Sequence, residues 1–232
     1  MLYLDRGPDS SPMGRDKASG IIGRIEAAGG PFDAPLRFTL AVTAMAAANA
    51  PGLIAKVVSH CCAELPHADA VRFVEMAREA LVKIVSTIGA PRAINGAAAL
   101  ADAADAAVRE ALPTDSRRCG AEYQYDAMRD RGLELWRSIY GSQADRLQER
   151  IGAWNPDLLE VIQTDLYGRL LSDCRVLDAK CTELCAICSL VPLDVPAQLK
   201  SHVRGAGFLG ATPDEIATAT AIAKAVCAYP TA

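Results

Sequence analysis

The sequence lacks the features that mark several classes of protein. Aromatic residues make up only 5% of the 232 residues, and no β-branched run alternates with polar residues, so a half-exposed β-sheet is not indicated. The chain has no block of Lys or Arg and a formal net charge of -4, which argues against a nucleic-acid partner. No apolar run reaches the ~18 to 20 residues that cross a bilayer, so no membrane partner is expected either.

Targeting signals are also missing. Residues 1–17 contain no apolar segment of the kind found in a secretory signal. The final four residues, from Tyr229 to Ala232, match no receptor-read address that we can assign. We therefore expect an intracellular, cytoplasmic protein, and the sequence leaves an organelle open.

Cofactor and metal motifs are absent as well. The sequence contains no glycine-rich phosphate loop, no nucleophile elbow and no HExxH, so we expect no nucleotide cofactor. Eight cysteines are irregularly clustered in a chain too large to need a disulfide framework, which favours reduced thiols. Three of them with a distant histidine do not have the spacing of zinc ligands, so we expect no metal.

What the chain does have is helix-forming composition. Alanine is abundant and 51% of the residues are hydrophobic, which predicts an all-α fold. Gly and Pro punctuate apolar positions at helical spacing. The expected helices run from 18 to the stop at Gly29, then at 36–49, 53–64, 68–88, 92–112, 122–140, 142–152, 156–173, 177–191, 195–208 and 213–228.

The chain divides at a polar segment in its middle. We expect a flexible tail at 1–17, a first helical unit at 18–112, a linker at 113–121 and a second unit at 122–232. The two units share a pattern over twenty residues without a gap, Ala41–His60 against Glu183–His202. Both segments consist of an apolar helix, a proline-marked break and a second helix that ends on Ser-His. This pattern indicates a tandem duplication.

The second copy predicts a pair of functional side chains. Glu183 lies nine residues before Pro192 and His202 ten residues after it, so an antiparallel helix hairpin would bring the two level. A carboxylate beside an imidazole fixes its tautomer and can relay a proton near neutral pH. The simpler alternative is a solvated Glu183 and a His202 that only packs. In the first copy Ala41 replaces the glutamate, so we interpret that copy as degenerate.

The cysteines of the second unit have two interpretations. Cys181, Cys185 and Cys188 form one stripe on an apolar helix, which is typical of small core residues. The rival interpretation makes Cys185 and Cys188 a redox dithiol. Their position in the middle of a helix counts against it, because reactive thiols favour helix N-termini.

The segment Glu183 to Ala217, ELCAICSLVPLDVPAQLKSHVRGAGFLGATPDEIA, resembles the carboxymuconolactone decarboxylase and alkylhydroperoxidase D-like superfamily. Arg131–Gly141 is similar to the lead-in of that domain, and Arg78–Asn95 resembles the end of such a unit. The resemblance covers most of the chain from about residue 33. It implies two related all-α units, a homo-oligomer, and His202 as proton donor or acceptor with Glu183 as its partner.

The resemblance also implies a reaction, with one departure. Where the peroxidase branch has E-x11-C-x2-C-x3-H, this chain has Val195 and Gln198 at the cysteine positions. The expected function is therefore cofactor-free decarboxylation or isomerisation of a small carboxylate or lactone, a lyase-type activity. The alternatives are a thiol-dependent peroxidase that uses Cys185 and Cys188, and a non-catalytic helical binding or scaffold protein.

Overall fold

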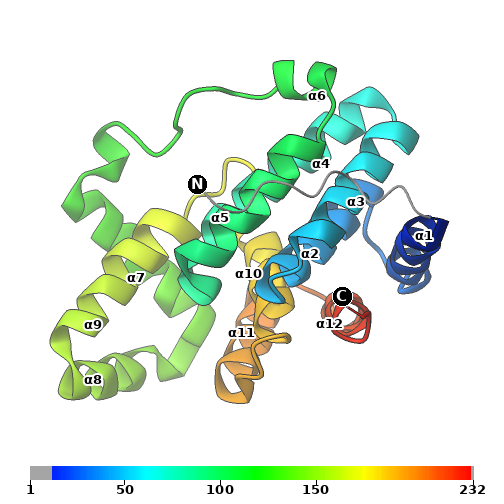
Figure 1. Cartoon of the computed structure of the whole chain (residues 1–232). Helices are drawn as coiled ribbons and strands as arrows, with labels where there is room; N and C mark the ends of the chain where they lie inside the picture. Colours follow the sequence, from blue (N-terminus) through cyan, green and yellow to red (C-terminus); the bar gives the residue numbers. More distant parts are fainter. Residues whose placement is uncertain (1–11, 231–232) are drawn as a thin grey trace.

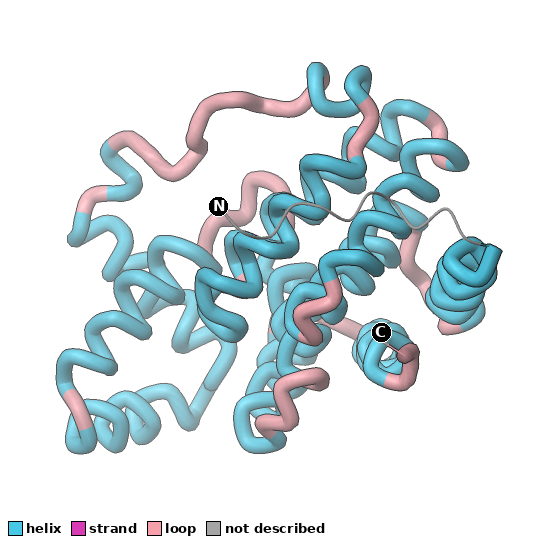
Figure 2. Tube along the Cα trace, viewed as in Figure 1, coloured by secondary structure: helices cyan, strands magenta, loops and turns pink. Residues whose placement is uncertain are grey.

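The computed structural model describes residues 12–230, and every regular element in that range is a helix (Figures 1 and 2). The all-α prediction is confirmed. The first half contains α1 (Pro12–Ala27), α2 (Ala34–Ala47), α3 (Pro51–Glu64), α4 (His67–Lys83), α5 (Val85–Ala103) and α6 (Ala106–Glu110). The second half contains α7 (Tyr125–Tyr140), α8 (Ala144–Trp154), α9 (Pro156–Glu160), η3 (Val161–Leu171), α10 (Ala179–Leu190), α11 (Pro196–Phe208) and α12 (Pro213–Cys227). Two short 3-10 turns, η1 (Ala121–Tyr123) and η2 (Gly141–Gln143), flank α7.

Helix starts follow the capping chemistry of the sequence. The Thr212 hydroxyl accepts a hydrogen bond from the Glu215 amide, and the Glu215 carboxylate accepts one from the Thr212 amide. The predicted capping box of α12 is therefore present. Asp178 caps α10 by accepting from the amide of Cys181 at 2.6 Å. Asp33 does the same for α2 at the amide of Leu36.

Several boundaries differ from the expected ones. Residues 1–11 of the expected tail lie outside the described residues, but α1 already begins at Pro12, where proline suits the first helical position. The stop at Gly89 is a kink inside α5, because glycine there adopts φ 74° and the helix resumes through Pro91. The helix predicted for 92–112 ends at Ala103 and resumes as α6. The segment 113–120 is irregular, as predicted, and forms the long loop at the top of Figure 2.

One hydrophobic core draws on both halves of the chain. Helix α2 is buried from Phe38 to Ala47 and packs against α3, α4 and α5 on the one hand and α10 and α12 on the other. Burial of apolar surface on this scale is the main source of stability in such a fold. The division into two related units stays a prediction, and the core of the first half is completed by helices of the second.

A smaller core forms where α7 crosses η3, and two glycines make that crossing possible. A Cβ atom on Gly132 would lie 2.0 Å from the carbonyl oxygen of Gln163, and one on Gly168 would lie 2.0 Å from that of Met128. η3 is a π-helix, whose wider turn was not predicted. Trp136, Tyr167 and Leu171 are buried in this second core.

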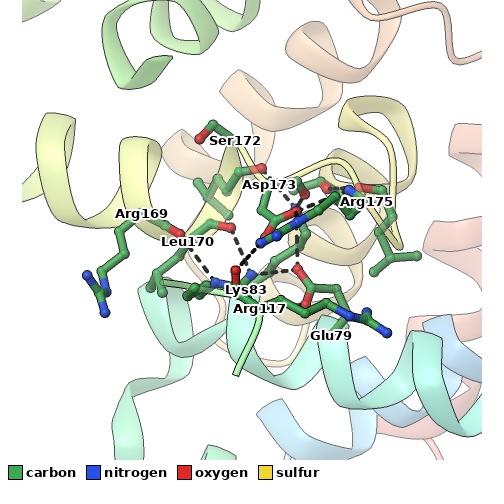
Figure 3. Close-up of polar contacts among 12 residues, drawn as sticks. Glu79, Lys83, Arg117, Arg169, Leu170, Ser172, Asp173 and Arg175 are labelled. Carbon is green, nitrogen blue, oxygen red and sulfur yellow. Dashed lines mark hydrogen bonds and ion pairs between the residues drawn. The ribbon is translucent and has the colours of Figure 1, made fainter. Parts of the chain in front are cut away.

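A buried ionic cluster joins α4 to the segment that follows η3 (Figure 3). The Lys83 side chain is fully buried and donates to the carbonyl oxygens of Leu171 at 2.9 Å and Asp173 at 2.6 Å. Burial lowers the pKa of Lys83, and the nearby Glu79 carboxylate opposes that shift. An unpaired buried ammonium is costly, so these two carbonyls fix the second half against the first.

Arginines complete the cluster. The two terminal nitrogens of Arg118 donate hydrogen bonds to the two carboxylate oxygens of Glu79, at 2.6 and 3.0 Å. Arg175 and the hydroxyl of Tyr123 each donate to Asp173 at 2.6 Å. Burial alone would raise the pKa of Asp173, but these donors hold it well below its usual value. Of these pairs, Arg118–Glu79 has both side chains largely buried, and removing one partner of a buried pair typically costs ~3 to 5 kcal/mol.

Candidate functional site

Helices α10 and α11 form the antiparallel hairpin that the sequence predicted, side by side at the centre of Figure 1. The break between them includes Asp194, in the left-handed region at φ 52°, and Pro196 opens α11 at a position that needs no amide donor. Gly205 leaves room for two neighbouring helices, because a Cβ there would lie 2.6 Å from Ile139 on α7 and 2.9 Å from a carboxylate oxygen of Glu183 on α10.

The hairpin brings Glu183 and His202 together, as the spacing predicted. His202 Nδ1 lies 2.9 Å from Glu183 Oε2, and the two residues are 8% and 1% exposed. Burial by itself lowers the pKa of His202, but the charge and hydrogen bond of Glu183 outweigh burial, so the net shift is upward. The alternative of a solvated Glu183 is wrong, because this residue is 1% exposed and its carboxylate contacts the imidazole.

The second oxygen of Glu183, Oε1, is buried without a hydrogen-bond partner among the described residues. His202 Nε2 likewise makes no hydrogen bond within the described part of the chain. A buried carboxylate oxygen without a donor is costly, so Oε1 can accept a hydrogen bond from a bound molecule or an ordered water. The pair therefore retains capacity to exchange a proton or a hydrogen bond with a bound molecule.

His202 lines a cavity of about 600 Å³. Its walls come from α5, α7, α8, η3, α10 and α11, and most of the lining side chains are apolar. Gln198 and Val195, which stand where the peroxidase branch has cysteines, also line it. The volume falls within the range of small-molecule sites, ~300 to 1,000 Å³.

An aromatic wall faces His202 across this cavity. Trp136 packs against Tyr140 and Tyr167 with ring centroids 4.3 and 5.1 Å apart. The two tyrosine hydroxyls lie 2.7 Å from each other. Burial raises the pKa of both phenols, so they stay protonated at neutral pH. The aromatic wall was not predicted, because Tyr167 lies 27 positions beyond Tyr140 in the sequence.

The cysteines of α10 behave as core residues. Cys185 and Cys188 are fully buried, and burial raises the pKa of Cys185 to about 12 and that of Cys188 well above its usual value. Buried thiols with raised pKa values are poor nucleophiles, which disfavours the redox interpretation. In the first copy, His60 packs edge-on against Phe38 at 5.8 Å, and Ala41 is buried where the glutamate would stand.

Within residues 12–230, no group of three His, Cys, Asp or Glu side chains is placed to hold a metal ion. Over the same range, no helix combines the length and apolar character that a membrane crossing requires.

Two curated proteins are similar to this chain, and both are named Peroxisomal protein 2. The protein from Saccharomyces cerevisiae is 28% identical over 158 residues, which cover 60% of this chain and 56% of that protein. The protein from Schizosaccharomyces pombe is 28% identical over 186 residues, which cover 80% of this chain and 83% of that protein. The chain thus spans little more than half the length of the first relative. No family model and no solved structure matches the chain significantly.

These comparisons correct the functional interpretation of the sequence. The resemblance to the carboxymuconolactone decarboxylase and alkylhydroperoxidase D-like superfamily is wrong as an assignment, because no family model supports it and the relatives carry a different name. The expected lyase activity and its thiol-peroxidase alternative depended on that assignment and are wrong with it. The homo-oligomer was implied by the same resemblance and is no longer supported. The physical reason is that an apolar helix, a proline break and a second helix form a pattern that alanine-rich chains repeat readily.

The relatives' name agrees with the expected intracellular location. It gives no support to the cytoplasm over an organelle.

Replacing Gly205 with Ala tests the close crossing of α10 and α11. We expect Gly205→Ala to lower the free energy of unfolding by ~1 to 3 kcal/mol, because the new methyl group collides with Ile139 and Glu183. Gly207→Ala on the same helix meets nothing within 4 Å and should be neutral or stabilising by ~0.5 to 1 kcal/mol. Urea unfolding measures both, and equal effects of the two changes would contradict the close approach.

Replacing Glu183 with Gln tests the coupling of the pair. The change removes the charge that raises the pKa of His202 and leaves burial, so the titration midpoint of His202 should move to lower pH. In the unchanged protein, the pair's contribution to stability is fully present below about pH 6.5, the ordinary histidine pKa, and is lost as pH rises through the raised value. NMR titration resolves this shift, since the chain has only three histidines and His60 and His67 serve as references. An unmoved midpoint would show that the two side chains do not interact.

Proposed function

We propose that this protein is a peroxisomal enzyme that binds a small, largely apolar molecule and transfers a proton to or from it. The buried His202–Glu183 pair on the wall of a 600 Å³ cavity carries the proposal. The peroxisomal location rests on the printed name of the two relatives.

The chemistry follows from the arrangement of the two groups. Glu183 fixes Nδ1 of His202 as a donor and stabilises the charged ring, so Nε2 is the atom that faces a bound molecule. A general acid or base must lie within hydrogen-bond reach of the proton it moves, and a ring on the cavity wall meets that requirement. The apolar side chains around His202 lower the local dielectric, which strengthens an electrostatic interaction between His202 and a bound molecule.

Cell imaging tests the location. We expect a fluorescent protein fused to the N-terminus of the chain, with the C-terminus left free, to coincide with a peroxisomal marker in yeast cells, since the relatives are named for that organelle. The fluorescent protein alone is the control and should fill the cytoplasm. A fusion that also fills the cytoplasm would contradict the peroxisomal part of the proposal.

Deuterium labelling tests proton transfer and does not require the substrate to be identified first. The purified protein is incubated with peroxisomal metabolites in D2O, and mass spectrometry searches for a compound that gains deuterium. We expect the label with the unchanged protein and a loss of ~100-fold or more in its rate with His202→Gln, the scale of general acid–base catalysis.

His67→Gln is the matched control, because His67 is exposed at the start of α4, and it should label at the original rate. A labelling rate that His202→Gln leaves unchanged would remove this residue from the reaction. Binding of a metabolite without any labelling would make the protein a binder and not an enzyme.

A further inference from the structure

A second, smaller cavity adjoins the one that His202 lines. It measures about 280 Å³ and shares Tyr140, Leu147, Arg150 and Ser201 with its larger neighbour. The shared lining residues place the two cavities next to each other, so a ligand of the larger cavity lies beside the smaller one. The smaller cavity differs in chemistry, because its lining is rich in arginine.

Three arginines line the smaller cavity: Arg146 and Arg150 from α8 and Arg204 from α11. Arg204 follows His202 by two residues, and residues at that spacing lie on nearly opposite faces of a helix. Arg204 accordingly lines the smaller cavity and not the larger one. The hairpin that positions His202 therefore positions an arginine of the neighbouring cavity as well.

None of these three arginines has a carboxylate oxygen within 4 Å among the described residues. Asp145 and Glu149 lie on α8 but do not line the cavity. Elsewhere in the described chain, Arg72, Arg118 and Arg175 each pair with an aspartate or a glutamate. The smaller cavity thus gathers positive charge that the protein itself does not neutralise.

Aromatic contacts orient two of the guanidinium groups. Arg150 lies over Trp154 at 5.2 Å and Arg204 over Phe208 at 6.0 Å. A stacked guanidinium keeps the N–H groups along its edge free for an anion. Arg146 and Arg150 are four residues apart on one helix, and like charges at that spacing repel unless an anion lies between them.

We infer that the smaller cavity binds the phosphate group of a molecule whose apolar part occupies the larger cavity beside His202. The inference rests on the proposed function and names the class of its ligand as a phosphate ester. Three guanidinium groups suit the two negative charges and several oxygens of a phosphate monoester better than the single charge of a carboxylate. Gln143, which also lines the cavity, adds a neutral amide donor.

Tryptophan fluorescence of the full chain tests this inference. The chain has two tryptophans, and both Trp136 and Trp154 line the larger cavity, so their emission reports its occupancy. The probes are octyl phosphate, octanoate and 1-octanol, which share one apolar chain. We expect octyl phosphate to bind at least ~10-fold more tightly than octanol or octanoate, with an affinity that falls as salt is added.

Substitution of the three arginines tests whether they cause the preference for octyl phosphate. Arg146→Gln, Arg150→Gln and Arg204→Gln should each weaken octyl phosphate binding by ~10-fold, because each removes one charged donor. Arg146 and Arg204 do not line the larger cavity, so these two changes should leave octanol binding unchanged. All three side chains are exposed, so the fold should persist, and unchanged thermal unfolding verifies it. Arg137→Gln is the matched control, since Arg137 is exposed on α7 and lines neither cavity.

The outcomes separate this inference from the function on which it rests. If octanol binds but the phosphate adds no affinity, or the three variants bind octyl phosphate as before, the phosphate site is overturned and the apolar site stands. Equal affinity for octanoate and octyl phosphate would overturn the choice of phosphate. If no probe changes the tryptophan emission, both the phosphate site and the proposed apolar ligand site are contradicted.

Discussion

The hydrogen bond between Glu183 and His202 depends on how closely α10 and α11 approach, and the rest of the site depends on that bond. A carboxylate with 1% exposure is tolerated inside an apolar core only when a partner compensates its charge. Gly205 supplies the space for the approach, and the imidazole supplies the partner. The same contact uses Nδ1 of His202, so the proposed proton transfer depends on the second ring nitrogen.

The two cavities lie where the two hydrophobic cores meet. The main core holds α10 and its neighbours, whereas the smaller core holds α7 and η3. Side chains from both contribute walls, so the position of the aromatic wall relative to His202 depends on how the cores are fixed together. The cluster of Lys83, Glu79 and Asp173 provides that fixation from the far side of η3. Substitutions that contact neither cavity can therefore still change the geometry of the site.

Local chemistry made much of this architecture predictable. The helix boundaries around Thr212 and Pro196 follow capping and proline rules that act within a few residues. The contact of Glu183 with His202 was predictable because one hairpin carries both. The π-helix at Val161–Leu171 was not, since it results from the tight crossing at Gly132 and Gly168 and not from local propensity. The cluster around Lys83 joins residues 88 and 90 positions apart, which no local pattern reports.

Family assignment failed for a related reason. The quoted motif described a helix hairpin with an acid and an imidazole, which is a geometry that many helical chains can adopt. The residues that would make it specific, a cysteine pair at Val195 and Gln198, are absent. The proposed function rests on the cavity, whose lining residues come from six helical elements.

The long separation between Lys83 and its acceptors also governs the order of folding during synthesis. Helix α4 leaves the ribosome long before Leu171 and Asp173 exist, and at ~5 to 20 residues per second the delay lasts several seconds. Throughout that interval the Lys83 ammonium group lacks its two carbonyl acceptors and stays in water, so this face of α4 stays exposed. The buried contacts of Lys83 can therefore form only after residues 171–173 have been synthesised.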